Sequence, residues 1–114
     1  SNPLEKAIQA YDEAVKLSPT SHEAFLMNAR ANRNLNTDAS RAKMAHNYEG
    51  FINALRTKNM LNDAEMQPAV LEAYMQIGDY FKSSDKTKAI TSFENVLKID
   101  PSHEYSLKSL RTLK

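Results

Sequence analysis

The segment KAITSFENVLKIDP, residues 88–101, decides the fold, because the chain contains a close copy of it, KAIQAYDEAVKLSP, at residues 6–19. The two segments match at one constant offset, in their apolar positions and in the closing proline. In each segment the apolar residues recur at spacings of three and four, which is the period of one face of an α-helix. The proline cannot continue a helix. The repeat therefore predicts two equivalent amphipathic helices near the two ends of the chain.

The composition favours a helical globular chain and excludes several classes of function. The 114 residues, 41% hydrophobic and 25% charged, suit one domain of ordinary size. Two glycines and four prolines argue against a turn-rich β fold. Fifteen basic against fourteen acidic residues leave no net field that would attract nucleic acid or anionic lipid. The absence of cysteine excludes disulfides and thiolate metal sites, and no apolar run approaches a membrane span.

The helical period extends over almost the whole chain. It predicts six helices, at about residues 4–17, 22–35, 39–58, 64–82, 86–99 and 103–113. Ser21 and Ser102 follow the two repeated segments and are predicted to cap the next helices. Asn36 is predicted to end the second helix in a left-handed conformation. Pro68 is predicted to lie in the first turn of the fourth helix, which then starts near Gln67; the alternative is a kink at Pro68.

The C-terminal half carries the most specific pattern, Tyr74-x-x-Ile77-Gly78-x-x-Phe81, then Ala89-x-x-x-Phe93-x-x-Val96, then Pro101. This pattern resembles a tetratricopeptide repeat. The resemblance implies an all-α fold, an antiparallel helix-pair solenoid with a C-terminal capping helix. In such a repeat Gly78 and Ala89 let the paired helices approach closely, and Phe81 and Phe93 fill the seam between them.

The resemblance implies a single domain over residues 1–114, in four parts. These are a half repeat at 4–19, a divergent repeat with longer helices at 21–59, a whole repeat at 66–101 and a capping helix at 102–114. We expect Leu107 and Leu110 of the capping helix to face inward. Ser1 and Asn2 are typical of an expression-tag remnant. The half repeat implies either that the solenoid is cut at its N-terminus or that it begins on a half unit.

The middle of the chain departs from the family pattern. Asparagines stand at apolar positions in Phe25-x-x-Asn28-Ala29-x-x-Asn32, and the partner helix reads Asn47-x-x-x-Phe51-x-x-Ala54. Phe25 and Phe51 are 26 residues apart, against 19 for Tyr74 and Phe93, so this region has longer helices or an insertion, or is a generic helical hairpin. Asn28 and Asn32 either form a buried amide network with Asn47 or line an open face that awaits a ligand.

No motif indicates catalysis. The three histidines lack metal-ligand spacing, and the two glycines are isolated within helical patterns, so no phosphate loop is present. Asp12 and Glu13 are expected to be a solvated pair on an exposed helix face. We therefore expect no enzyme activity, no catalytic residue, no cofactor and no metal.

The resemblance implies a protein-interaction module that binds a peptide or partner helix on the concave face of its first helices. On this chain that face would carry Glu23, Leu26, Met27, Arg30, Arg33, Glu72, Met75, Gln76, Asp79 and Lys82. Some family members clamp a terminal carboxylate with Lys and Asn on these faces, but other residue types stand at the corresponding places here.

An alternative function is that of a structural or assembly segment. The chain would then pack on another domain of a longer repeat protein, or self-associate through its unpaired N-terminal helix. Either function implies a protein or peptide partner, with no nucleic acid and no membrane insertion. The compartment stays open between the cytoplasm and, if an upstream signal was removed, the periplasm or the exterior.

Overall fold

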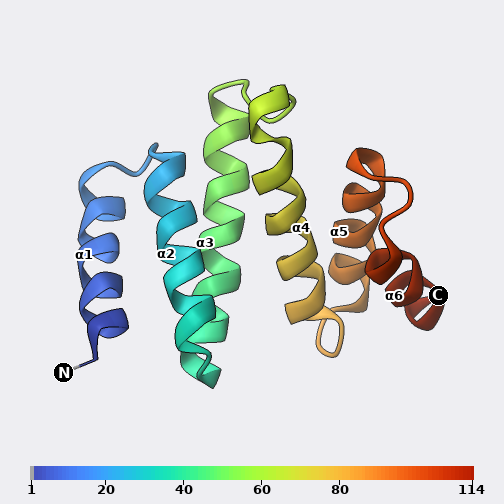
Figure 1. The fold of residues 1–114 in the computed structure, drawn as a ribbon, viewed down its shortest axis with the longest axis horizontal. Coiled ribbons are helices and arrows are strands. Elements are labelled where there is room, and N and C mark those ends of the chain that lie inside the picture. The colour runs from blue at the N-terminus through green and yellow to red at the C-terminus, as the bar shows by residue number, and fades with distance from the viewer. Residues whose placement is uncertain (1) are drawn as a thin grey trace. The chain divides into compact units, whose positions relative to one another are not determined.

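The computed structural model describes residues 2–114 as six α-helices and one 3-10 turn, with no strand in that range (Figure 1). The elements are α1 (Pro3–Leu17), α2 (His22–Leu35), α3 (Asp38–Thr57), η1 (Ala64–Met66), α4 (Gln67–Phe81), α5 (Lys86–Ile99) and α6 (Glu104–Leu113). The predicted all-α class is confirmed. Ser1, half of the expected tag remnant, lies outside the described residues; Asn2 accepts the Leu4 N–H at 2.8 Å and caps α1.

The chain forms two compact units, divided between Leu61 and Asn62. Unit 1 holds α1, α2 and α3, and unit 2 holds η1 and α4 to α6. In each unit, helices that follow one another in sequence pack side by side. The single domain over residues 1–114 stays a prediction from the sequence.

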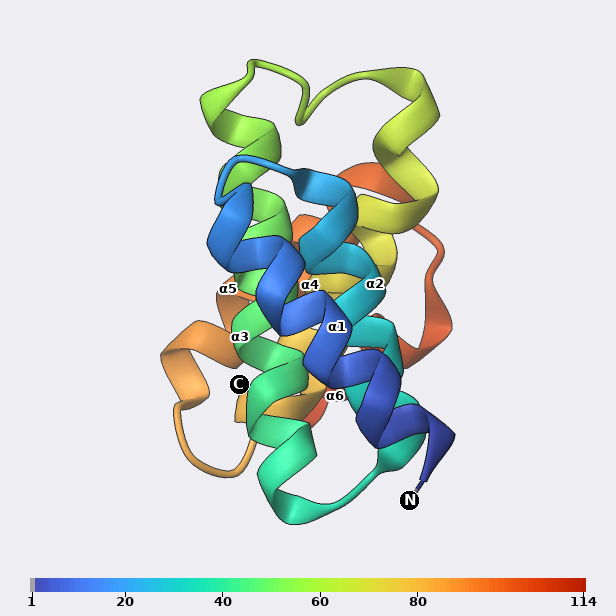
Figure 2. The same cartoon turned by 90° about the vertical axis from the view of Figure 1, so that its left-hand side faces the viewer.

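Unit 1 is built on the pairing of α2 with α3, and α1 packs on α2. Figure 2 shows α1 as its foremost helix. The apolar stripe of α3 is buried, since Met44 is 3% exposed and Tyr48, Phe51 and Leu55 are fully buried. The ring of Phe25 on α2 lies directly over Gly50 of α3, where no side chain keeps the two helices apart.

The extra residues of the middle region lengthen one helix. α3 has 20 residues, whereas α5 has 14. Thr37 and Ser40 form a capping box that starts α3 immediately after the α2 terminus. That terminus is Asn36, whose φ of 55° and ψ of 44° confirm the predicted left-handed end.

Unit 2 has the seam that the repeat pattern predicts. Phe93 of α5 is fully buried, and its ring lies against Gly78 of α4. Ala89 is also fully buried, and Phe81 packs against this cluster. α4 begins at Gln67, with Pro68 in its first turn and η1 before it, so the unkinked alternative is confirmed.

Two predictions about α6 are wrong. Its N-cap is His103 and not Ser102, because Ser102 donates its hydroxyl to Asp100 at 2.9 Å and the helix starts one residue later than predicted. His103 Nδ1 instead accepts the Ser106 N–H at 3.3 Å. Leu107 is 39% exposed, because the face toward α5 runs through Ser106 and Ser109 to Leu110 and Leu113, which are buried.

Candidate functional site

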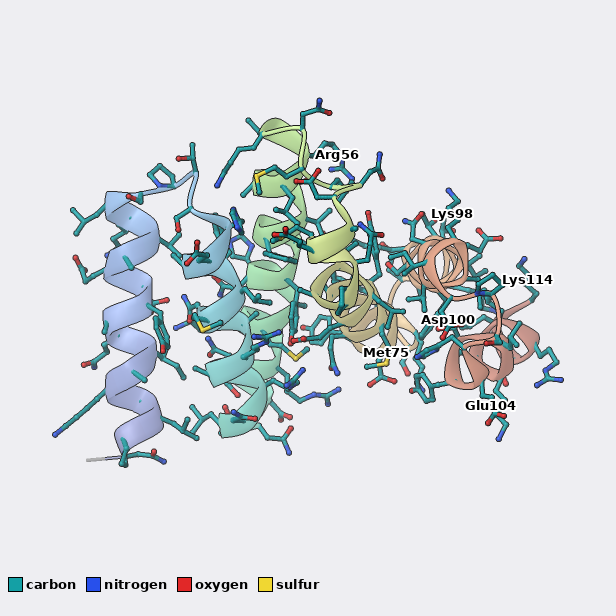
Figure 3. The ribbon with its side chains drawn as sticks, turned by 45° about the horizontal axis from the view of Figure 1, so that its top comes forward. Arg56, Met75, Lys98, Asp100, Glu104 and Lys114 are labelled. Atoms are coloured by element: carbon teal, nitrogen blue, oxygen red, sulfur yellow. The ribbon has the colours of Figure 1, made fainter. Side chains whose placement is uncertain are left out.

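One face of α4 carries a small hollow that gathers several of the predicted binding residues. Met75, Gln76 and Asp79 come from α4, and Tyr105 of α6 closes the hollow. Figure 3 shows Met75 projecting from the lower side of α4, toward the side on which Glu104 of α6 lies. Lys98 of α5 lies on the upper side in that view. We call Glu72, Met75, Gln76, Asp79, Lys82 and Tyr105 the α4 patch.

The polar end of the α4 patch is a hydrogen-bonded network. Lys82 Nζ donates to the Tyr105 hydroxyl at 2.8 Å and pairs with Asp79 at 3.1 Å, and the Tyr105 hydroxyl in turn donates to Asp79. Hydrogen bonds to Tyr105 and Asp79 raise the pKa of Lys82 above its usual value, although partial desolvation opposes them. The network therefore fixes the Tyr105 phenol and Asp79, which line the hollow with Met75, through their contacts with the Lys82 ammonium.

Tyr105 was missed from the sequence. It lies off the predicted apolar stripe of α6, and 41% of the residue is exposed. Its ring nevertheless meets the buried Phe93 ring edge-on, at a centroid distance of 5.9 Å. One feature of the sequence could have pointed to Tyr105 as a binding residue. It is a tyrosine among the exposed positions of a capping helix, and tyrosine combines apolar area with a polar tip, which suits it to binding surfaces.

The α2 patch, Glu23, Met27, Arg30 and Arg33, lies on unit 1. Glu23 and Met27 are exposed, and both arginines are partly buried. Arg33 Nη1 donates to the Tyr48 hydroxyl at 2.8 Å, which fixes its guanidinium against α3. Leu26, predicted with this set, is only 9% exposed and packs in the core, so it is a packing residue and not a surface contact.

The asparagines of α2 are buried, which contradicts an open face there. Asn28 and Asn32 are each 1% exposed. Asn32 Nδ2 donates to Asn28 Oδ1 at 2.8 Å, and Asn28 Nδ2 donates to Asp12 Oδ1 of α1 at 2.8 Å. The predicted partner was wrong, because Asn47 donates to its own helix at the Lys43 carbonyl. The amide network therefore ties α2 to α1.

Asp12 anchors this network, so the expectation of a simply solvated carboxylate was wrong. It accepts from Asn28, and Lys43 Nζ of α3 pairs with its other oxygen at 2.9 Å. Partial burial acts to raise the pKa of Asp12, but the hydrogen bonds from Asn28 and Lys43, with the charges of Lys43 and Lys16, hold it below its usual value. Three helices of unit 1 meet at this one side chain.

A metal-ligating group of three or more His, Cys, Asp or Glu side chains does not occur within residues 2–114. None of the helices described over that range is both long and apolar enough to cross a membrane.

Comparisons with known proteins agree with the geometry. Residues 71–103 match the family model of the tetratricopeptide repeat. The fold is similar to a solved structure, the C-terminal part of a TPR repeat-containing protein from Cytophaga hutchinsonii, at 25% identity and a TM-score of 0.75. That likeness covers 94% of this chain, which spans 40% of the length of the solved one. No curated protein matches the chain.

Proposed function

We propose that this tetratricopeptide-like domain is a protein-interaction module that binds a peptide or a partner helix, with the α4 patch of unit 2 and the α2 patch of unit 1 as separate binding surfaces. The tetratricopeptide repeat is a non-catalytic fold that generally mediates protein–protein interaction or scaffolding. The observation that carries the proposal is the hollow on α4, which brings Met75, Gln76 and Asp79 together with Tyr105.

The α4 patch suits one apolar side chain of a peptide and the polar backbone beside it. Met75 offers a flexible, polarisable thioether that adapts to different apolar groups. Gln76 and Asp79 supply amide and carboxylate groups next to it, and the Tyr105 ring forms a wall whose tip is already hydrogen-bonded. Tyrosine is enriched at the centres of interfaces because it buries apolar area at little entropic cost.

The α2 patch would add a positively charged contact. Met27 is 36% exposed at its centre, with Arg30 and Arg33 on the following turns of the same helix. The hydrogen bond to Tyr48 holds the Arg33 guanidinium in place on this surface. An acidic or carbonyl-rich segment of a partner fits this surface.

Peptide selection from a displayed library tests the proposal. The wild-type chain should enrich a common motif with one apolar position, and Met75→Glu should abolish that enrichment because it places a charge in the apolar hollow. Arg30→Glu tests the α2 patch separately and should weaken enrichment of any acidic motif that the wild-type chain selects. Lys98→Glu is the matched control on the other side of unit 2 and should keep full enrichment. Equal loss in Lys98→Glu, or an unchanged motif in Met75→Glu, would contradict the proposed site.

A second candidate function is assembly through α1, favoured by a difference in burial between the two repeated segments. Ala89, Phe93 and Val96 of α5 are fully buried. Their counterparts on α1, which are Ala7, Tyr11 and Ala14, are only partly buried. α5 is packed between α4 and α6, whereas α1 packs mainly on α2 and reaches α3 through the ion pair of Asp12 with Lys43. The stripe of α1 therefore has unburied apolar area that a further helix could cover.

Light scattering during size-exclusion chromatography tests this second function. Assembly predicts a concentration-dependent dimer of the 114-residue chain that becomes monomeric in Tyr11→Glu. Glu13→Gln, an exposed position of the same helix, is the control and should leave the dimer intact. A wild-type monomer at high concentration would contradict self-association through α1.

A further inference from the structure

A second pocket of unit 2 lies between the end of α4 and the last turns of α6. Its walls are Lys82, Ser83, Lys108, Ser109, Thr112 and Leu113. Its chemistry differs from that of the α4 patch, because two ammonium groups and three hydroxyls line it and no carboxylate does. Lys82 is the one residue that the two surfaces share.

Ser109 shows that this pocket has unused donors. The residue is only 9% exposed, yet its hydroxyl makes no hydrogen bond to any described residue, although it lines the pocket. Among the described residues the one fully buried side-chain atom without a partner is Asn32 Oδ1, so the Ser109 oxygen keeps some exposure and offers an unused donor at the pocket wall. Ser83, across the pocket, also makes no hydrogen bond to the described chain.

The two lysines provide the positive charge. The Lys108 ammonium forms neither a hydrogen bond nor an ion pair with any residue that the structure describes. Lys82 uses two of its three N–H donors on Tyr105 and Asp79, which positions the ammonium and leaves one donor. The Thr112 hydroxyl donates its proton to the Lys108 carbonyl at 3.2 Å, so Thr112 lines the pocket but has no donor for a ligand.

We propose that Lys82, Ser83, Lys108 and Ser109 form a binding site for a phosphoryl group. The Lys108 ammonium, together with the remaining N–H of Lys82, whose charge Asp79 partly balances, attracts the nearly double negative charge that a phosphate monoester carries at neutral pH. Ammonium and hydroxyl donors together suit an oxyanion with three acceptor oxygens better than a carboxylate with two. The pocket, at about 320 Å³, has room for such a group, since a water molecule takes up about 30 Å³ of liquid.

The electrostatic surroundings add to this preference. The first turn of α5 follows the pocket residue Ser83 and carries Lys86 and Lys88, while the acidic side chain at this N-terminus is the N-cap Asp85, which accepts the Lys88 N–H. Both the first turn of α5 and the last turn of α6, with Arg111, are therefore basic. A dianion near these two turns gains long-range attraction.

Amide NMR of the 114-residue chain, titrated with inorganic phosphate at constant ionic strength, tests the site. Saturable shifts should centre on Ser83 and Ser109. Lys108→Gln should weaken binding by about tenfold through the loss of a charge-assisted contact, and Ser109→Ala by about fivefold. Lys98→Gln removes an equally exposed lysine outside the pocket and should leave the affinity unchanged.

A serine peptide and its phosphoserine form identify the source of the phosphoryl group. Tighter binding of the phosphopeptide than of inorganic phosphate assigns the site to phosphorylated protein, and equal binding assigns it to free phosphate. Acetate that competes as well as phosphate would overturn the proposal in favour of a carboxylate site. Equal weakening by Lys98→Gln and Lys108→Gln would also overturn it, because only diffuse charge would then be at work. Since these variants spare Met75 and Gln76, their outcome is independent of peptide binding at the α4 patch.

Discussion

The α2–α3 pair and the α4–α5 pair close the same kind of seam in opposite ways. In α4–α5 the glycine, Gly78, lies on the first helix and receives Phe93 from the second. In α2–α3 the phenylalanine, Phe25, lies on the first helix and the glycine, Gly50, on the second. A close helix pair thus needs a small residue opposite an aromatic ring, and either helix can supply it.

The two pairs also differ in what they bury. Over Gln67–Ile99, described in full, Ser92 is the one buried polar side chain, and it donates to its own helix at the Lys88 carbonyl. The α2–α3 pair instead buries Asn28, Asn32, Ser40 and Asn47. Asn32 Oδ1 is buried without a hydrogen-bond partner among the described residues. The α2–α3 pair therefore gives up apolar packing for a polar link to α1, while α4–α5 relies on apolar packing.

The largest expected effect separates the two aromatic residues. Phe93→Ala should lower the free energy of unfolding by about 3–5 kcal/mol, because a fully buried ring is replaced by a cavity. Phe25→Ala should cost only about 1–2 kcal/mol, because its ring is partly exposed and the loss is closer to a transfer term. Guanidinium denaturation followed by circular dichroism measures both. Equal losses would mean that the two seams are equivalent after all.

The next effect concerns the polar core. Asn28→Leu should destabilise the chain by about 1–3 kcal/mol, because it leaves Asp12 without its amide donor and Asn32 Nδ2 without one acceptor. The matched variant Asn53→Leu, at an exposed position of α3, should change stability by less than about 0.5 kcal/mol. A thermal midpoint clearly raised by Asn28→Leu would show that the amide network does not stabilise unit 1.

Substitution of the two glycines should have a smaller effect. It tests directly whether the glycine and the phenylalanine exchange helices between the two seams. A Cβ on Gly50 would lie 2.5 Å from Cε1 and 3.0 Å from Cγ of Phe25, so the ring must move, and Gly50→Ala should cost about 1–2 kcal/mol. A Cβ on Gly78 would lie 3.0 Å from the Phe93 ring, and a small shift would relieve it. Gly78→Ala should therefore stay within about 1 kcal/mol of wild type, because alanine's better helix propensity offsets the strain.

A double-mutant cycle gives the control for Gly50. In the Phe25→Leu background the added methyl group meets a smaller, more flexible side chain, so Gly50→Ala should lose most of its cost. Additive costs would show that the strain at Gly50 arises from somewhere other than Phe25.

The sequence predicted the helices well because their signals are local. Periodicity, the cap at Ser21, the left-handed Asn36 and the position of Pro68 each depend on a few neighbouring residues. The partners of long side chains depend on how the helices dock. The link from Asp12 to Asn28 joins two helices, as does the reach of Tyr105 to Asp79. The start of α6 shifted by one residue because a histidine can replace serine as the cap, and that shift was invisible in a copied Ser-His-Glu motif.

The smallest effect is the pH dependence that Asp12 gives to unit 1. Its pKa is lowered in the folded state, so the stabilisation is present above the unfolded pKa, near 3.8, and is lost as the pH falls through the lower folded value. Asp12→Asn should therefore destabilise the chain at pH 7, by about 1 kcal/mol because the side chain is partly exposed, and the gap to wild type should shrink below about pH 4. Glu13→Gln, on the neighbouring exposed residue, is the matched control and should show a much smaller gap. Urea midpoints measured from pH 7 to pH 2.5 decide the matter, and a gap that stays constant over this range would mean that the carboxylate charge plays no part in joining α1 to α2 and α3.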